Sequence, residues 1–497
     1  MTTGHVEGLE IIDGTEYYVI PNVDRLDPFL VGVVSPSDHW LYASSAGGLA
    51  AGRVNAEGSL FPYRTDDLLH QVQGFSGGWT GIRENGVIWE PFTGRPTPET
   101  TRSLARSTAG DRLLIEETHE GLGLRASACW CFSDSSGILR RVRITRLDDG
   151  RETRSIEVMD GLRELVAGGA GVGVMQSMSC LINAYTRAEI VGSEGLATVS
   201  MESALSDRAE PAESLTATIA WGTGLPGAAI VLDAAESERF ARGASPRSTP
   251  RVVGRATAYL RHAVVELETE GHAGWTTVAD VDRSQTQVAA IRNRLANETD
   301  LESALTLEVE ATSAAMDAIS AETDGLQHSG DPIGDAHHRT NTLYNDMRGG
   351  IPFDRETLPW GDWTAFCHLR NHAVAQRHAS WLATRPDDEI IARTTLLEET
   401  AAAGDPDLER LALEYLPFWF GRRHGDPSRP WNRFNIRIRD AEGNRLLSYE
   451  GNWRDIFQNW EALALAHPGW LDQIIAKFVN ATTADGFNAY RITRDGI

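Results

Sequence analysis

The sequence predicts a multidomain β + α protein in which a large antiparallel β-sandwich is followed by a helical connector and then by a helical domain. Three observations predict this order. The chain has 497 residues, which is too long for one ordinary hydrophobic core. Short strand-like runs fill its first half, and the hydrophobic period becomes helical after Asp282. We expect the β-sandwich at 1–278, the connector at 279–330 and the helical domain at 331–497.

The β-sandwich is predicted from β-branched and aromatic runs bounded by Gly, Asp, Ser and Pro. Examples are Tyr17 to Ile20, Arg141 to Ile144, Thr216 to Trp221 and Ala228 to Leu232. Because no regular helices separate these runs, antiparallel sheets are expected.

The connector is predicted as two helices. Ser284 is a candidate N-cap, and Val288, Ile291 and Leu295 follow at helical spacing. A second helix is indicated by the apolar positions Leu301, Leu305, Val309, Met316 and Ile319.

A Gly/Pro/Asp break at 325–335 precedes the helical domain. Amphipathic segments with Trp-rich connections follow, which favours helix pairs in a toroid, although a bundle has the same periodicity. About 160 residues follow the break, whereas six helix pairs need roughly twice that number. We therefore expect a truncated product.

Composition limits the class of partner. The formal net charge is −24, and among the 46 basic residues only Lys477 is a lysine. Nucleic acid and anionic membranes both require a basic footprint, so neither is expected as a partner. The sequence contains no run of eighteen apolar residues and no signal peptide, so we expect a cytoplasmic protein.

Several weak motifs are better explained by structure than by chemistry. The four cysteines include no CxxC pair, and His368 and His372 lack the neighbouring Glu of a zinc protease, so no metal is expected. The run GGAGVGV at 168–174 has the wrong glycine spacing for a dinucleotide site. A GxSxG elbow is absent from the sequence.

Three segments carry a resemblance to a known family. They are SPSDHWLYASSAGGLAAGRVNAEGSLFPYRTDDLLH (35–70), NTLYNDMRGGIPFDRETLPWGDW (341–363) and YEGNWRDIFQNWEAL (449–463). Together they resemble cellobiose phosphorylase-like proteins, the group classed as glycoside hydrolase family 94 and its relatives. The resemblance implies a β-sandwich, a helical connector and an (α/α)6 barrel, which would be incomplete in this chain. It also implies that the GGAGVGV run is a loop of the sandwich.

The same resemblance implies an inverting glycoside phosphorylase that acts on an oligosaccharide or glucoside. It implies inorganic phosphate as co-substrate, no other cofactor, and a homodimer as one assembly. Family members carry the general acid on a later barrel segment, which would lie beyond residue 497. A hydrolase of the same barrel type and a non-catalytic carbohydrate-binding module remain alternatives.

The family lines its non-reducing sugar subsite with an Arg-Asp-x-x-Gln-Asp helix segment. The matching positions are Arg454, Asp455, Gln458 and Asn459, the last an amide where the family has an acid. Arg donors and carboxylate acceptors suit vicinal hydroxyls, and Trp453 could stack on a pyranose ring. The alternative is an ordinary helix with solvated polar groups.

A second candidate region is the turn-rich segment 345–363, expected to be one functional loop. Its candidate sugar-binding residues are Arg348, Trp360, Asp362 and Trp363, and an interdomain salt-bridge cluster is the alternative. If the chain is active, the carboxylates to test are Asp362, Asp455, Glu461, Asp485 and Asp495.

Overall fold

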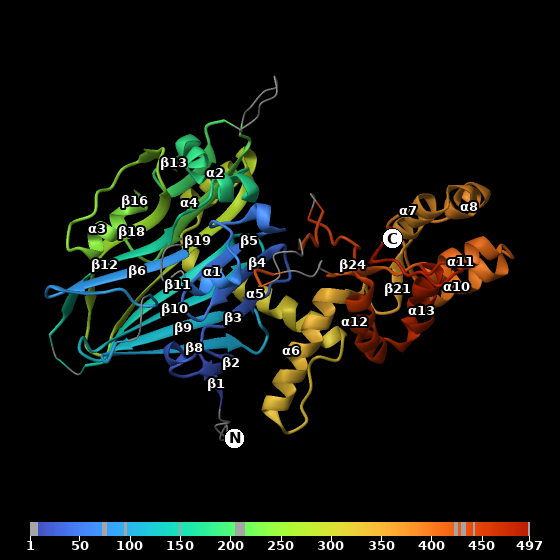
Figure 1. Ribbon diagram of the computed structural model, residues 1–497, viewed down its shortest axis with the longest axis horizontal. Helices are drawn as coiled ribbons and strands as arrows, with labels where there is room; N and C mark the ends of the chain where they lie inside the picture. Colours follow the sequence, from blue (N-terminus) through green and yellow to red (C-terminus); the bar gives the residue numbers. More distant parts are fainter. Residues whose placement is uncertain are drawn as a thin grey trace. The chain divides into compact units, whose positions relative to one another are not determined.

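The computed structural model describes residues 8–71, 77–93, 97–148, 150, 152–203, 214–421, 426–428, 434–440 and 443–495. The chain forms two compact units (Figure 1). The β unit comprises Met1–Met316 with Asp426–Trp431, and the helical unit comprises Asp317–Gly425 with Asn432–Ile497. The division falls inside helix α5 (Leu301–Glu322), whereas the sequence predicted the last domain to begin at 331.

The β unit is built on an 11-stranded antiparallel sheet. In spatial order its strands are β1 (Leu9–Ile12), β2 (Thr15–Ile20), β8 (Thr100–Ser107), β9 (Leu113–His119), β10 (Leu124–Ser133), β11 (Gly137–Arg146), β19 (His272–Ser284), β15 (Thr216–Thr223), β14 (Leu196–Met201), β13 (Thr186–Val191) and β17 (Arg251–Val253). Mostly β-branched and aromatic runs form these strands, as the sequence predicted.

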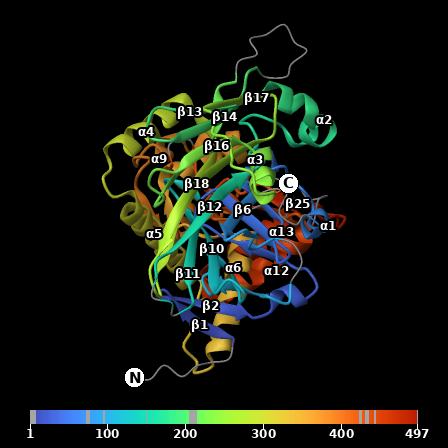
Figure 2. The same ribbon diagram turned by 90° about the vertical axis from the view of Figure 1, so that its left-hand side faces the viewer.

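A smaller antiparallel sheet of five strands packs on the large one. Its order is β16 (Ala229–Asp233), β18 (Thr257–Leu267), β12 (Arg154–Arg163), β6 (Gly77–Glu84) and β7 (Val87–Trp89), and Figure 2 shows β18, β12 and β6 side by side. The buried cluster between the sheets joins Ile82 and Val158 of the small sheet to Val142 and Trp275 of the large one. The predicted β-sandwich is therefore present. A third sheet contains β3 (Leu30–Val33), β4 (His39–Ser44) and β5 (Leu49–Arg53).

Helices cover the edges and the outer face of the sandwich. They are α1 (Asp66–Gln71), α2 (Val172–Tyr185), α3 (Ala235–Ala241), α4 (Gln285–Asn297) and α5. Ser284 caps α4 in a reciprocal capping box with Gln287, as its sequence position predicted. Leu305 and Val309 of α5 pack on Trp221 of the large sheet. Within the described residues, no helix is long and apolar enough to span a membrane.

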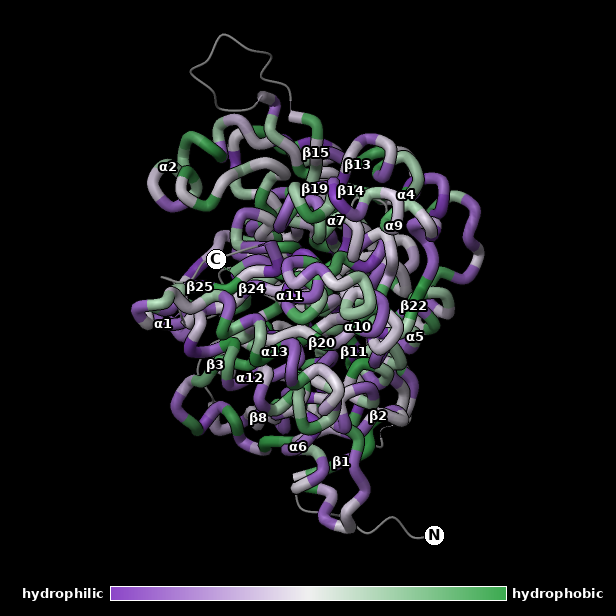
Figure 3. The backbone as a smooth tube through the Cα atoms, turned by 90° about the vertical axis from the view of Figure 1, so that its right-hand side faces the viewer, coloured by the Kyte–Doolittle hydropathy of each residue, from purple (hydrophilic) through white to green (hydrophobic). Residues whose placement is uncertain are grey.

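The helical unit contains the end of α5 and eight further helices among its described residues. They are α6 (Pro332–Gly349), α7 (Trp360–Arg370), α8 (His372–Arg377), α9 (Ala379–Leu382), α10 (Arg393–Ala402), α11 (Pro406–Glu414), α12 (Trp453–Ala466) and α13 (Leu471–Asn480). Short strand pairs connect them: β20 (Ile351–Pro352) with β23 (Phe418–Trp419), β21 (Thr357–Pro359) with β22 (Ile390–Ala392), and β24 (Glu450–Asn452) with β25 (Arg491–Thr493). Hydrophobic and hydrophilic residues are interspersed along helices of this unit such as α12 and α13 (Figure 3).

The segment 345–363 differs from its prediction as a single loop. Helix α6 continues to Gly349, and helix α7 begins at Trp360. Two short strands, β20 and β21, lie between them. The glycines and prolines that suggested a loop instead end one helix and precede the next. The closed barrel remains a prediction for this unit.

Candidate functional site

The largest cavity that we describe lies in the β unit beside helix α2 and has a volume of about 520 Å³. We call it the α2 cavity. Its lining residues come from helix α1 and the segment before it, the segment after β12, helix α2 and the starts of β13 and β18. They are Pro62, Tyr63, Arg64, Thr65, Leu68, Glu164, Leu165, Val166, Ala167, Met175, Gln176, Ser179, Ile182, Asn183, Thr186, Ala256 and Thr257. The volume is in the range of small-molecule sites.

Side chains of the sandwich hold the wall of this cavity in place. The Thr257 hydroxyl donates to the carbonyl of Leu165 at 2.7 Å, and the Thr218 hydroxyl donates to the carbonyl of Val166 at 2.6 Å. The start of α2 is held by Val172, whose N–H donates to the Glu57 carboxylate at 2.7 Å. Hydrogen bonds from the sheets and from Glu57 thus hold the backbone from Leu165 to Val172 in place, which preorganises the wall of the α2 cavity.

Glu164 places a carboxyl group in this cavity. Its backbone is left-handed, with φ of 54°, a conformation that costs energy for a residue with a side chain. Burial raises the pKa of the Glu164 carboxyl, and Arg64 and Arg163 oppose this shift. The Arg64 guanidinium lies 3.8 Å from the Glu164 carboxylate. Among the described residues, the buried Oε2 atom has no hydrogen-bond partner.

The other polar groups of the α2 cavity offer donors and acceptors on several sides. Tyr63 packs edge-on against Trp40 with ring centroids 6.0 Å apart. Burial and the nearby Asp426 raise the pKa of Tyr63 to about 12, so its hydroxyl remains a donor at neutral pH. Gln176 and Asn183 add amide groups from α2. This mixture can satisfy a polyhydroxylated ligand.

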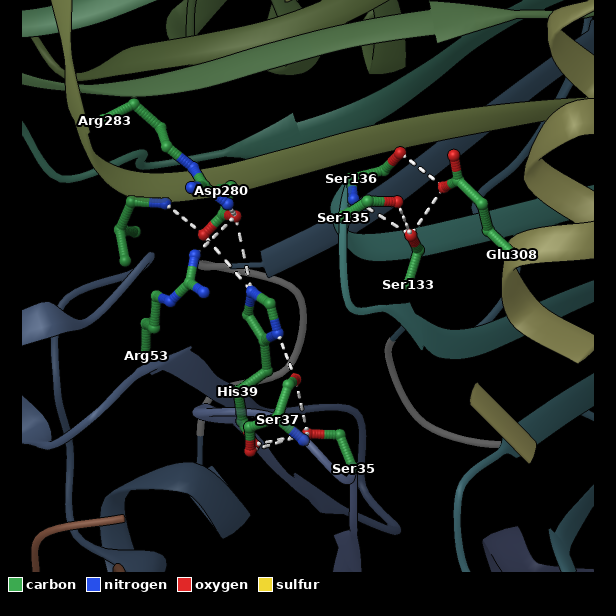
Figure 4. A network of polar contacts seen from close by, with 11 residues as sticks. Ser35, Ser37, His39, Arg53, Ser133, Ser135, Ser136, Asp280, Arg283 and Glu308 are labelled. Carbon is green, nitrogen blue, oxygen red and sulfur yellow. Dashed lines mark hydrogen bonds and ion pairs between the residues drawn. The ribbon is translucent and has the colours of Figure 1, made fainter. Parts of the chain in front are cut away.

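A second group of polar residues lies buried between β4 and β19 (Figure 4). The Ser37 hydroxyl and Nδ1 of His39 are 2.7 Å apart, and Nε2 of His39 lies 3.3 Å from Asp280. Arg53 donates to Asp280 at 3.2 Å, and Arg283 also donates to it. Burial alone would raise the pKa of Asp280, but His39, Arg283 and Arg53 outweigh burial and lower it.

This Ser37–His39–Asp280 chain contains the residue types of a hydrolytic triad, but its position excludes that role in this structure. All three residues are 0% exposed, so the hydroxyl faces no substrate. The imidazole also uses Nδ1 toward the serine, whereas a serine protease uses Nε2. The network therefore ties two sheets together through satisfied buried charges.

The other contacts in Figure 4 attach helix α5 to the hairpin between β10 and β11. Ser133 and Ser136 donate to the Glu308 carboxylate at 2.5 and 2.6 Å. Arg294 of α4 lies 2.9 Å from the other Glu308 oxygen. These bonds fix the connector helices on the sandwich.

The residues predicted on α12 divide between solvent and core. Arg454 is 85% exposed and lies 3.4 Å from Asp455, which is 31% exposed. Gln458 is exposed as well. Asn459 is buried and donates to the side chain of Asn345 at 2.8 Å. Trp453 is half-buried against Phe478. A sugar that contacts Arg454, Asp455 and Gln458 would therefore lie on an open helix face.

The two tryptophans predicted as a sugar platform lie in the core of the helical unit. Both Trp360 and Trp363 are 0% exposed. The Trp360 indole donates to the carbonyl of Leu382 at 2.8 Å, and Trp363 stacks on Phe366 with ring centroids 6.0 Å apart. In contrast to the prediction, neither ring has a free face, because helical packing of this aromatic-rich segment covers both.

Asp362 and Arg348 have protein partners. Asp362 accepts hydrogen bonds from the Tyr415 hydroxyl at 2.6 Å and from the Arg494 guanidinium. The Arg348 guanidinium lies over the Tyr344 ring at 5.8 Å. The structure therefore does not gather the nine predicted residues around one cavity that we describe.

Sequence reasoning missed the residues of the α2 cavity. The GGAGVGV run was expected to be a loop, yet α2 begins at Val172 inside it. Apolar residues at helical spacing after the glycines were the available signal for α2. No local signal marks Arg64 and Glu164 as neighbours, because they are far apart in sequence and meet only through the sheets.

Comparison with known proteins gives little further information. No family model matches the chain, and no curated protein matches it. A protein described as a putative kojibiose phosphorylase from the human microbiome is 9% identical, with a TM-score of 0.33 over 81% of this chain and 45% of that chain. A polysaccharide lyase is 12% identical, with a TM-score of 0.28 over 54% of this chain and 34% of that chain.

A third solved structure is described as a putative aldose 1-epimerase from Escherichia coli K12. It is 10% identical, with a TM-score of 0.27, and the match covers 51% of this chain and 98% of that chain. This chain spans less than half the length of the phosphorylase and about a third of the lyase. TM-scores this low carry no inference about function.

Proposed function

We propose that this chain is a carbohydrate-active enzyme whose β unit binds a saccharide in the α2 cavity. The observation that carries the proposal is the lining of this cavity. Tyr63, Arg64, Glu164 and Asn183 surround a volume of about 520 Å³ with a ring, a cation, a carboxyl and an amide. A sugar presents apolar C–H faces together with many hydroxyls that both donate and accept, so it needs such a mixture.

We further propose the inverting phosphorolysis of a glucosidic bond, with Glu164 as the proton donor. As the bond between the anomeric carbon and the leaving oxygen breaks, the Glu164 proton passes to that oxygen. An oxygen of inorganic phosphate forms the new bond from the opposite face of the sugar. Burial raises the pKa of the Glu164 carboxyl, which is the direction that a general acid requires. The resemblance would instead place the acid beyond residue 497.

Hydrolysis in the same cavity is the rival reaction. An inverting hydrolase needs a second carboxylate that activates water. Among the described residues that line the α2 cavity, Glu164 is the single carboxylate. Phosphate supplies its own nucleophilic oxygen, so one carboxyl group is sufficient for phosphorolysis. This difference favours a phosphorylase over a hydrolase.

The test is to incubate the purified chain with inorganic phosphate and a panel of glucosides and glucose disaccharides, and to measure the sugar 1-phosphate formed. We expect phosphate-dependent turnover that Glu164→Gln reduces by about 100-fold or more. Glu238→Gln, at an exposed position on α3, is the matched control and should leave turnover unchanged.

The outcomes separate the alternatives. Release of free glucose without phosphate would replace the phosphorylase by a hydrolase. Saccharide binding without any turnover would replace it by a carbohydrate-binding module. A homodimer and a cytoplasmic location remain proposals that follow from the resemblance and the sequence, and light scattering on the purified chain tests the first.

A further inference from the structure

We propose that a second cleft in the β unit, the arginine cleft, binds the phosphate group of a small ligand. It lies between the strands β13, β14 and β15 and helix α4, and its volume is about 280 Å³. Arg187, Arg283 and Arg292 all line it, and Glu189 is the one carboxylate among its described lining residues. The lining of the arginine cleft is therefore net positive, whereas the whole chain has a formal net charge of −24.

The floor of the arginine cleft is polar, although a helix covers it. Arg187 pairs with Ser200, and Glu189 pairs with Thr198, across β13 and β14. Alternate residues of a strand share one face, so these side chains all point toward α4. A sheet face under a helix is ordinarily apolar, because apolar packing is what holds the two layers together.

The three arginines are incompletely neutralised by protein carboxylates. Arg187 lies 3.4 Å from Glu189, and both side chains are about one-third exposed. Arg292 is 3.8 Å from Glu194, which is too long for a strong hydrogen-bonded ion pair. Their charges therefore remain available to an anionic ligand.

Arg283 is the buried member of the set, with 11% of its side chain exposed. Its carboxylate partner, Asp280, also accepts a hydrogen bond from Arg53 at 3.2 Å. Asp280 and the neighbouring Asp282 both interact electrostatically with Arg283 and Arg53, but the buried Nε–H of Arg283 has no hydrogen-bond partner among the described residues. A buried donor without a partner is costly, and an oxyanion in the cleft would accept this hydrogen bond. The contacts to Asp280 also hold Arg283 in position (Figure 4).

A phosphate group fits this chemistry. Guanidinium groups bind phosphate oxygens through paired N–H donors, and the hydroxyls of Thr198 and Ser200 can donate to the remaining oxygens. The volume admits inorganic phosphate or a phosphorylated monosaccharide-sized molecule rather than a long polyanion. The arginine cleft is a separate cavity from the α2 cavity, so this inference does not depend on the saccharide proposal.

Titration calorimetry at constant ionic strength tests the inference with three probes: inorganic phosphate, glucose 1-phosphate and glucose. We expect binding of at least one phosphate probe, and we expect Arg187→Gln to leave any glucose binding in the α2 cavity unchanged. Arg187→Gln and Arg292→Gln should each weaken phosphate binding by about 10-fold. The control Arg251→Gln changes an exposed arginine of β17 that does not line the cleft, and it should leave the affinity unchanged.

The outcomes are decisive in either direction. Equal affinity for both phosphate probes identifies inorganic phosphate as a sufficient ligand, and binding of glucose 1-phosphate alone identifies a phosphate ester. Absence of binding by both phosphate probes, or equal affinities in wild type and Arg187→Gln, would overturn the inference. The exposed Arg292 position on α4 guards against a folding defect, because its change removes no buried contact. Ser179→Trp, which obstructs only the α2 cavity, should leave intact the phosphate binding that depends on Arg187 and so separates the two proposals.

Discussion

Glu164 joins a strained backbone, a raised pKa and a position on a cavity wall in one residue. Each feature alone also occurs at structural positions. Their combination is typical of functional sites, because burial that raises the pKa of a carboxyl group has to be stabilised by the surrounding fold. The contrast with Arg454, which is 85% exposed, shows that residue type alone does not identify a site.

Substitution of Trp363 tests whether this predicted sugar-binding residue is instead part of the core of the helical unit. Trp363→Ala should lower the free energy of unfolding of this unit by about 3–5 kcal/mol, because it leaves a large cavity in the core. Arg454→Ala is the control and should change it by less than about 0.5 kcal/mol. Urea unfolding followed by circular dichroism measures both. A large loss of stability in Arg454→Ala would show that our placement of this residue is in error.

Asp346 of α6 provides a test by pH. Burial raises the pKa of its carboxyl to about 8 from an ordinary value of 3.8, and Glu322 adds to the shift. Between these values the folded state holds a proton that the unfolded state releases. This group therefore lowers the free energy of unfolding as pH rises, by up to about 1.4 kcal/mol per pH unit.

Asp346→Asn removes this titration while keeping the size of the side chain. The variant should gain stability relative to the wild type as pH rises from 5 toward about 8, and urea unfolding at each pH measures the difference. The control is Glu398→Gln, which neutralises an exposed carboxylate on α10 of the same unit. A stability difference between Asp346→Asn and wild type that is independent of pH would contradict the raised pKa.

At the scale of elements, helix α13 carries the chain's one lysine on its buried face. Lys477 is 1% exposed, and its ammonium group lies 3.9 Å from the Glu414 carboxylate. Burial lowers the pKa of Lys477 to about 8, and Glu414 opposes this shift. The amine is thus chemically reactive near pH 8 but physically covered.

An amine-reactive reagent should therefore label Lys477 only when α13 opens. We expect labelling of the native chain to be slower by about 100-fold or more than labelling in urea, which corresponds to an opening free energy of about 2.7 kcal/mol or more. Mass spectrometry of the α13 peptide measures the rate, and the amino-terminal amine is the internal reference. Similar rates in both states would mean that α13 does not stably cover its lysine.

The elements also show what the sequence could predict. Strand runs and the Ser284 cap were predictable, because alternation and capping are local properties. The segment 345–363 was not, because glycine and proline end helices as readily as they form loops. Helix α2 was obscured by the glycines at its start. The closeness of Arg64 and Glu164 depends on strand pairing across the whole sandwich, which no local pattern encodes.

At the scale of the molecule, the chain forms a β unit and a helical unit. The candidate ligand sites, however, lie in a different unit from the one that the sequence indicated. The sequence directed attention to the helical unit, in which Trp360 and Trp363 are core residues. The β unit instead contains both the α2 cavity and the arginine cleft. The sandwich is therefore the part of the chain in which we expect ligands to bind.

The most direct test of this account is saccharide binding by wild type and by two variants of α2, measured by calorimetry. Ser179→Trp places a large ring in the α2 cavity from an exposed helix position, whereas Ser177→Trp, its matched control, makes the same change outside the lining. We expect a glucoside to bind the wild type and Ser177→Trp alike, and to lose its affinity by about 10-fold or more for Ser179→Trp. Equal binding by all three proteins would contradict the account. So would a loss of binding in Arg454→Ala, measured in the same way, together with unchanged binding in Ser179→Trp.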